Sequence, residues 1–242
     1  MEIMKTAVFI FHTELVFFLP QHAAEVPLTF ADHQSLKHLI EALGVPHVEV
    51  GQVLQDGQPV GLDSLPRDGA RLEIFPPSPG CPIAARFLLD NHLGRLAAYL
   101  RMLGFDCLYE NDFQDDEMAA RLAADPRILL TRDRRLLMRK AVRYGYCPRS
   151  LAPQAQLLEV VRRFDLAPLI RPFRRCLRCN TLLVPVEKSA VLERLEPLTR
   201  RYFDEFHLCP ACNQVYWKGS HYQRMLALIA GLDATRPINR AA

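Results

Sequence analysis

The sequence lacks any apolar run of the roughly 18–20 residues that a membrane-spanning helix requires. Its apolar beginning is interrupted by His12 and Glu14, and it has neither a basic leader nor a small-residue cleavage site. We therefore expect no signal peptide, no membrane anchor and a cytoplasmic location. Internal repeats and low-complexity tracts are also missing. With 50% apolar and 24% charged residues, the composition is that of a globular chain rather than a disordered one.

Positive charge is scarce in the first third of the chain. Residues 1–80 contain 4 Lys and Arg against 10 Asp and Glu, and the remainder contains 26 against 17. The net charge of +3 therefore hides an acidic N-terminal part and a basic body. A basic body favours a polyanionic partner such as nucleic acid, although solvated charged faces give the same balance. The acidic part suggests a surface for a protein partner, or a cover for the basic body.

Residues 1–78 have the pattern of a β-grasp, ubiquitin-like domain, with short strands around one helix. Thr6–His12 and Leu15–Leu19 are rich in β-forming residues and separated by two polar residues, which predicts a hairpin. Apolar residues at i, i+3, i+4 and i+7 over 35–43 predict an amphipathic helix that ends at Gly44. Further strands are predicted at 48–54, Val60 and 71–75.

The first domain also lacks a free Gly-Gly carboxyl end. A sulfur carrier or conjugated modifier of the ubiquitin-like fold needs a free Gly-Gly carboxyl end. Here Gly80 stands alone and the chain continues, so this function is excluded. The Pro-rich stretch at 76–80 is predicted to be a linker, because Pro and Gly prevent either regular structure from continuing.

Residues 84–168 alternate between strand and helix patterns. Strands are predicted at 86–90, 106–109 and 127–130, with helices at 93–103, around Met118 and Leu122, at 136–144 and at 153–164. Alternation at this spacing predicts an α/β domain in which helices cover a parallel sheet. A third domain is predicted at 169–232, where the alternation stops and a final helix occupies about 221–231.

Three aspartates follow or flank the predicted strands of the α/β domain. Asp90 ends the first strand, Asp133 follows the third, and Asp115 opens the second helix. Functional groups of a parallel sheet gather beyond the carboxyl ends of its strands. Converging carboxylates need a cation, and oxygen ligands suit Mg²⁺ or Mn²⁺. Such an ion can activate water against a phosphodiester. The alternative is that each aspartate only caps a helix.

The basic residues around Asp133 favour metal binding over helix capping. Between 127 and 149 it is the one acid among eight basic residues: Arg127, Arg132, Arg134, Arg135, Arg139, Lys140, Arg143 and Arg149. An isolated carboxylate in so basic a stretch fits a metal ligand beside a phosphate-binding surface. Packing of the long basic stems is the alternative.

Two cysteine pairs form the strongest local signal in the chain. Cys176 and Cys179, and then Cys209 and Cys212, are each separated by two residues, the spacing of a tetrahedral structural Zn²⁺ site. Disulfides are disfavoured in the cytosol. Aromatic and basic residues interleave over 216–222, a composition that can stack on bases and contact phosphates, although the aromatic rings can equally pack against the zinc ribbon.

Several motifs also resemble a known family. They are Arg86-Phe-Leu-Leu-Asp90, Leu93-Gly-Arg-Leu96, Asp115-Asp-Glu-Met118, Arg127-Ile-Leu-Leu-Thr-Arg-Asp133, Arg175-Cys-Leu-Arg-Cys-Asn180 and Cys209-Pro-Ala-Cys212. Together they resemble the PIN-like RNase family named after the C-terminal region of the Mut-seven exonuclease, whose domain ends in a zinc ribbon. The N-terminal domain is similar to the ubiquitin-like domain found fused to it. The resemblance covers nearly the whole chain.

This resemblance implies a metal-dependent ribonuclease. Asp90, Asp115 and Asp133 would bind the catalytic Mg²⁺ or Mn²⁺, with Asp116 as the alternative to Asp115, and Thr131 would help orient the site. Many PIN nucleases carry a fourth acid after the Thr-x-Asp pattern. Here Arg134-Arg135-Leu136 follow, so either another acid such as Asp112 substitutes or the metal set is reduced.

The function predicted from the sequence is therefore hydrolysis of RNA, with single-stranded RNA as substrate. The residues predicted to contact RNA are Arg95, Arg132, Arg134, Arg135, Lys140, Lys218 and His221. The alternative function is a non-catalytic, RNA- or ribosome-associated zinc-ribbon adaptor, in which the aspartates are helix caps.

Overall fold

The computed structural model describes residues 4–233, except for the side chains of His221, Leu232 and Asp233. The chain divides into two compact units. One comprises the chain up to Pro82 together with Asp112–Arg149, and the other comprises Ile83–Asn111 and the chain from Ser150 onward. Within residues 4–233, no helix has both the length and the apolar character needed to cross a membrane. The domain boundaries expected from the sequence stay a prediction.

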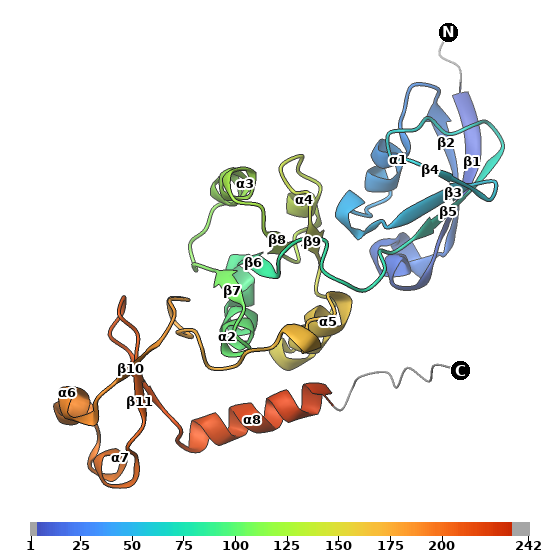
Figure 1. Ribbon diagram of the computed structural model, residues 1–242. Coiled ribbons are helices and arrows are strands. Elements are labelled where there is room, and N and C mark those ends of the chain that lie inside the picture. The colour runs from blue at the N-terminus through green and yellow to red at the C-terminus, as the bar shows by residue number, and fades with distance from the viewer. Residues whose placement is uncertain (1–3, 234–242) are drawn as a thin grey trace. The chain divides into compact units, whose positions relative to one another are not determined.

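The first unit begins with a five-stranded β-grasp sheet (blue to teal in Figure 1). Its strands are β1 (Met4–Phe11), β2 (Glu25–Ala31), β3 (Gln52–Gln55), β4 (Gln58–Val60) and β5 (Ala70–Phe75). Their order is β2-β1-β5-β3-β4; β1 and β5 are parallel and the other pairs are antiparallel. Phe9, Phe11, Leu72 and Ile74 are fully buried in alternate positions along the parallel pair, as a half-buried sheet requires.

Helix α1 (Leu36–Ala42) confirms the helix predicted from the 3.6-residue period. Leu36, Leu39 and Ile40 form its buried face. The side chain of Ser35 accepts a hydrogen bond from the backbone of His38 at the N-terminus. Gly44 adopts a φ of +95° just past the end, a conformation that a residue with a Cβ rarely adopts. Local sequence alone therefore determined both ends of this helix.

The hairpin predicted at Leu15–Leu19 is wrong. Residues 13–18 form a 3₁₀ helix, η1 (Thr13–Phe18), and β1 pairs with β2 after the short turn η2 (Pro20–His22). Leu15 and Phe18 are buried, and this spacing of three places both side chains on one face of a 3₁₀ helix. The β-forming composition of the segment was therefore misleading. Strand β3 likewise begins later than expected, after the 3₁₀ turn η3 (His47–Glu49).

The rest of the first unit contains α3 (Asp115–Ala124), β8 (Ile128–Leu130), α4 (Arg134–Leu137) and β9 (Gly145–Tyr146). β8 and β9 are parallel, with Leu129 beside Gly145. The helix predicted at 136–144 is reduced to one turn, because the chain must return to place β9 along β8. A Cβ at Gly145 would lie 2.7 Å from the end of the Leu137 side chain, so a larger residue here would require that side chain to shift.

In the second unit, β6 (Arg86–Leu89), η4 (Asn91–Leu93), α2 (Gly94–Met102) and β7 (Asp106–Leu108) form a β-α-β arrangement with parallel strands. α5 (Pro153–Arg163) and η5 (Ala167–Leu169) follow later in the chain. The ring of Phe87 packs edge-on against Phe105 and Phe164, at centroid distances of 6.0 and 5.9 Å. The predicted α/β class, with parallel strands and helices, is confirmed.

The C-terminal part of this unit has a small antiparallel sheet in the order β10-β11-β12 (orange to red in Figure 1). Its elements are β10 (Val184–Val186), α6 (Lys188–Val191), η6 (Leu192–Arg194), α7 (Pro197–Tyr202), β11 (Phe206–Leu208), β12 (Val215–Trp217) and α8 (Ser220–Asp233). Val191, Leu195, Phe206 and Val215 form its buried cluster. The sequence predicted only the last helix, because strands of three residues show no readable period.

Candidate active site and metal centre

Four cysteines form a cluster in the second unit. The Sγ atoms of Cys176, Cys179, Cys209 and Cys212 all lie within 4.8 Å of one another, and this is the only such group of potential metal ligands among residues 4–233. Cys176 and Cys212 are 3.5 Å apart, and Cys179 and Cys209 are 3.3 Å apart. This geometry can hold one metal ion with four thiolates, which leaves no coordination position for a substrate.

The two cysteine pairs sit in matching turns. The backbone N–H of Asn180 donates to the carbonyl of Cys176, and that of Asn213 donates to the carbonyl of Cys209. Both asparagines have positive φ, of 69° and 58°, which asparagine tolerates better than most residues. Each turn therefore brings its two sulfur atoms to the same side. Although burial opposes it, hydrogen bonds with Thr181 and the neighbouring cysteines lower the pKa of Cys179 and favour its thiolate.

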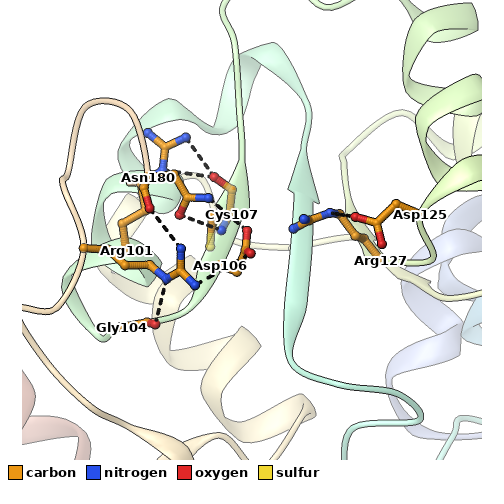
Figure 2. A network of polar contacts seen from close by, with 8 residues as sticks. Arg101, Gly104, Asp106, Cys107, Asp125, Arg127 and Asn180 are labelled. Carbon is orange, nitrogen blue, oxygen red and sulfur yellow. Dashed lines mark hydrogen bonds and ion pairs between the residues drawn. The ribbon is translucent and has the colours of Figure 1, made fainter. Parts of the chain in front are cut away.

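Arg101, on α2, connects this cluster to the β-α-β arrangement, and Figure 2 shows its contact with Cys107 of β7. Its side chain is buried and donates to the carbonyl oxygens of Cys107 (2.8 and 3.0 Å), Leu177 (3.1 Å) and Arg178 (2.7 Å). Leu177 and Arg178 lie between the first two cysteines. Desolvation by burial lowers the pKa of Arg101, although nearby thiols and Asp106 act against it. The cysteine turn is therefore held by a buried arginine whose hydrogen-bond acceptors are backbone carbonyls.

Asn180 adds a second connection to strand β7. Its side-chain oxygen accepts from the backbone N–H of Cys107 at 3.0 Å, and its side-chain nitrogen donates to the Asp106 carboxylate at 2.9 Å (Figure 2). One residue thus both shapes the cysteine turn and hydrogen-bonds to the neighbouring strand.

Asp133 lies at the N-terminus of α4, directly after β8. Its Oδ1 atom accepts from the backbone N–H groups of Arg135 (2.7 Å) and Leu136 (3.3 Å), so it is the helix N-cap. Its own N–H donates to the hydroxyl of Thr131, a fully buried residue, at 2.9 Å. Among residues 4–233 the second carboxylate oxygen has no hydrogen-bond partner. The Asp133 side chain is therefore fixed in place yet exposed to solvent.

Asp115 and Asp116 begin α3, whose N-cap is Gln114. Both carboxylates contact the guanidinium of Arg139, at 3.3 and 2.5 Å. The hydrogen bond with Asp116 is the main cause of the raised pKa of Arg139, and the charges of Asp115 and Asp133 contribute in the same direction. Arg139 therefore lies in the combined field of three exposed carboxylates that belong to the same unit.

Asp90 belongs to the other unit. It follows β6, is only 6% exposed and accepts from the N–H of Asn91 at 2.6 Å, so it caps the 3₁₀ turn η4. The carbonyl of Asn91 in turn accepts from the hydroxyl of Tyr109 at 3.0 Å. Both Asp90 and Asp133 therefore have the capping role that was the alternative to metal binding. Because the aspartates are divided between the two units, a joint site formed by all three stays a prediction.

The predicted RNA-contacting residues have different surroundings. Most of them are exposed: Arg95, Arg132, Arg135, Lys140 and Lys218. Lys218 forms an ion pair with Glu205. Arg134 donates to the carbonyl of Phe18 at 2.8 Å, and its guanidinium lies over that residue's ring. The side chain of His221 lies outside the part of the chain that the structure describes. RNA binding by these residues stays a prediction.

An ion pair that the sequence did not suggest, between the buried Glu49 and the half-buried Arg149, lies in the first unit. Glu49 is 1% exposed, and its carboxylate accepts from Arg149 at 2.9 and 3.2 Å and from the N–H of Cys147 at 2.6 Å. Desolvation acts to lower the pKa of Arg149, but the charge and hydrogen bond of Glu49 outweigh it and raise the pKa. Burial raises the pKa of Cys147 to about 11, so its thiol stays protonated at neutral pH.

This pair is part of a wider contact between the β-grasp domain and residues 112–149. Arg149 also lies over the ring of Phe18 at 5.0 Å, as Arg134 does at 5.1 Å. His47 bridges the Glu41 carboxylate (2.7 Å) and the carbonyl of Val142 (3.0 Å). Arg134 directly follows Asp133, so the β-grasp domain contacts the helix turn that carries this aspartate. Sequence reasoning missed the contact because its partners are about 100 residues apart.

The family model of the Mut7-C RNAse domain matches residues 85–229, more than half of the chain. The chain belongs to this family. A second model, the Mut7-C ubiquitin domain, matches residues 4–80. The β-grasp domain in front of the Mut7-C RNase domain is therefore the arrangement that the sequence motifs suggested, and it indicates a nuclease-like role.

No curated protein matches the Mut7-C chain. Among solved structures, the HVO 2177 protein of Haloferax volcanii matches with 17% identity and a TM-score of 0.28, over 32% of this chain and 88% of its own. Small archaeal modifier protein 1 of the same organism matches with 17% identity and a TM-score of 0.26, over 31% of this chain and 99% of its own.

Proposed function

We propose that this Mut7-C protein is a metal-dependent ribonuclease that hydrolyses RNA phosphodiester bonds with Mg²⁺ or Mn²⁺ held by Asp90, Asp115 and Asp133. The observation that carries the proposal is the presentation of Asp133 within a chain of an RNase family. One oxygen of its carboxylate is fixed by two backbone N–H groups, and the other faces solvent without a hydrogen bond from residues 4–233.

The donor chemistry fits a hard divalent cation. Carboxylate oxygens are the ligands that Mg²⁺ and Mn²⁺ prefer. The pKa of Arg139 is raised by the carboxylates of Asp115, Asp116 and Asp133, so this part of the site already attracts a cation. When bound, the cation lowers the pKa of a water molecule and stabilises negative charge on the phosphodiester.

The chain's own residues orient and bind. Thr131 fixes the backbone of Asp133 through its buried hydroxyl, which keeps the carboxylate in one position. Arg132, Arg135 and Lys140 are exposed near Asp133 in the sequence and supply charge for the RNA backbone. These basic residues support the binding of a phosphodiester next to Asp133. Because the Asp133 carboxylate is itself negatively charged, hydrolysis there needs a cation.

We assign Zn²⁺ to the four-cysteine cluster as a structural ion. Four sulfur ligands within 4.8 Å suit a tetrahedral Zn²⁺ site and leave no open position for catalysis. The ion would stabilise a segment whose buried cluster comprises only four residues.

The test is cleavage of a labelled single-stranded RNA with Mn²⁺ or Mg²⁺. Asp133→Asn and Asp90→Asn should each lower turnover at least a hundredfold and leave folding intact, because asparagine caps a helix about as well as aspartate. Asp204→Asn, a change at an exposed carboxylate paired with Lys188, is the matched control and should leave turnover unchanged. Equal turnover of Asp133→Asn and the unsubstituted protein would disprove the metal site.

A second function, an RNA-binding adaptor without catalysis, is favoured by one observation. Asp90 and Asp133 both serve as helix caps, a role that needs no metal. For an adaptor, no divalent metal supports cleavage, and RNA affinity is the same with Asp133→Asn. For the nuclease, cleavage depends on the metal and on both aspartates. The same set of proteins therefore separates the two functions.

A further inference from the structure

A cavity of about 400 Å³ lies beside the cysteine cluster, between the small antiparallel sheet and α8. Its apolar lining includes Phe173, Trp217, Tyr222 and Met225. This volume is within the range of small-ligand pockets. The cavity lies wholly within the second unit and involves none of the aspartates of the proposed active site.

Its aromatic side chains are held by specific contacts. The rings of Phe173 and Tyr222 lie 4.3 Å apart in a tilted arrangement. Trp217 is 38% exposed at the end of β12. A Cβ on Gly219 would lie 2.8 Å from the indole nitrogen of Trp217, so glycine lets the indole approach the backbone closely. One wall is therefore a preformed and partly exposed aromatic surface.

Basic groups surround this surface. Arg174, Arg175 and Lys218 line the cavity, and the only carboxylate among its lining residues is that of Glu205, which pairs with Lys218. Arg174 is exposed, and its guanidinium has no hydrogen-bond or ion-pair partner among residues 4–233. Because Lys218 pairs with Glu205 and Arg175 with Asp106, the positive charge that the cavity offers a ligand is mainly that of Arg174, beside the aromatic faces.

We propose that this cavity binds a nucleobase of single-stranded RNA, stacked on Trp217, with the adjacent phosphate on Arg174. Aromatic faces beside basic groups are the usual means of holding unpaired nucleotides without strict sequence preference. The positive charge argues against a purely apolar occupant. The proposal gives the substrate of the proposed ribonuclease a second contact, on the zinc ribbon formed by the cysteine cluster and the sheet β10-β11-β12. It rests on the proposed function for the identity of the ligand.

Trp217 is the single tryptophan of the chain, so its fluorescence reports the cavity directly. The Asp133→Asn protein is titrated with a six-nucleotide oligouridylate and, separately, with an oligomer of the same length and charge that lacks bases. The oligouridylate should quench the fluorescence at concentrations at which the abasic oligomer does not. Equal effects of both oligomers, or no effect of either, would overturn the proposal.

Substitutions test the stack independently of the fluorescence. In an anisotropy assay with labelled oligouridylate, Trp217→Ala and Tyr222→Ala should each weaken binding about tenfold, as expected from the loss of one base–aromatic stack. Trp217→Phe should retain most of the affinity. Tyr202→Ala removes an aromatic ring that is 64% exposed on α7 and does not line the cavity, so it should change nothing. Equal losses for Tyr202→Ala and Trp217→Ala would refute the site.

These experiments distinguish failure of the cavity proposal from failure of the ribonuclease proposal. Cleavage of RNA by a protein whose Trp217 does not respond to bases would refute the cavity and leave the ribonuclease intact. Base-dependent quenching without cleavage would support the cavity and refute the ribonuclease. Quenching by a mixed peptide library but not by oligouridylate would identify a protein-binding groove and overturn the proposal.

Discussion

Two arginines, the buried Arg101 and the half-buried Arg149, connect the central α/β part of this Mut7-C family member to its two appended domains, and their main partners differ in chemistry. Arg149 binds the carboxylate of Glu49 in the β-grasp domain. Arg101 binds backbone carbonyls of the cysteine turn, at Leu177 and Arg178. The pKa of Arg149 is raised, because the charge and hydrogen bond of Glu49 outweigh desolvation, whereas desolvation lowers that of Arg101.

The two arginines differ in what keeps their hydrogen-bond partners in place. Arg149 also donates to the carbonyl of Cys147 at 2.6 Å, but its counter-charge comes from the side chain of Glu49, so one substitution removes that charge. Arg101 depends on the shape of a backbone turn, and this shape depends on the cysteines and on the metal ion that we propose they bind. We therefore expect the β-grasp contact to be sensitive to side-chain changes and the ribbon contact to be sensitive to metal.

Removal of the cluster metal should have the largest effect. A zinc chelator, or Cys176→Ser, should unfold the ribbon and remove the carbonyl partners of Arg101, because structural metal sites contribute on the order of 10 kcal/mol to small domains. The near-ultraviolet circular dichroism of Trp217 should be lost while the β-grasp sheet persists. Cys81→Ser, outside the cluster, is the control. A ribbon that stays folded without metal would contradict this dependence.

Glu49→Gln should have the next largest effect. It removes the carboxylate charge that faces the half-buried Arg149, and breaking a pair with a buried partner costs about 3–5 kcal/mol. The shift of the denaturant midpoint for the unit that contains the β-grasp domain measures it. The double variant Glu49→Leu/Arg149→Met should recover most of this loss, since well-packed apolar groups replace both charges. A single variant as stable as the parent would show that the pair is dispensable.

Arg101→Lys should be milder. A lysine keeps the charge but cannot donate to several carbonyls in the fixed fork geometry of a guanidinium, so we expect a loss of about 1–3 kcal/mol. Thermal unfolding followed by Trp217 fluorescence provides the measurement. Arg95→Lys, at an exposed position on the same helix, should leave the transition unchanged. A smaller shift for Arg101→Lys than for Arg95→Lys would refute the role of the carbonyl contacts.

Arg139→Ala should have the smallest effect on stability, because its ion pairs with Asp115 and Asp116 lie at the surface. Its effect on the metal should be larger. Without a competing guanidinium, half-maximal RNA cleavage should require less Mn²⁺, which a titration of activity against Mn²⁺ measures. A requirement for more Mn²⁺ would mean that Arg139 supports the site rather than competes with the cation.

Features encoded by neighbouring residues could be predicted from the sequence. The cap of Ser35, the stop at Gly44 and the period over residues 35–43 determined α1, and the two-residue spacings predicted the cysteine cluster. The segment Leu15–Leu19 misled because its composition favours a strand, whereas burial of two residues three apart selects a 3₁₀ helix. Local propensity was there overridden by packing.

The candidate site also has local features that could be predicted from the sequence and long-range contacts that could not. Asp133 follows β8 as predicted, and its cap and its contact with Thr131 are local. The Glu49–Arg149 pair joins residues 100 positions apart, and neither residue belongs to a periodic pattern or motif. One sequence gives no signal for such a pair, because either residue is equally compatible with a solvated surface. Long-range pairs of this kind therefore need coordinates.

Asn180 has a consequence for solubility. β7 is an edge strand, and an uncovered edge offers its backbone groups to a strand of another molecule. Here the N–H of Cys107 is occupied by Asn180 and its carbonyl by Arg101. These contacts with Asn180 and Arg101 thus shield β7 from intermolecular β-pairing, and loss of the cysteine turn would expose an edge that favours aggregation.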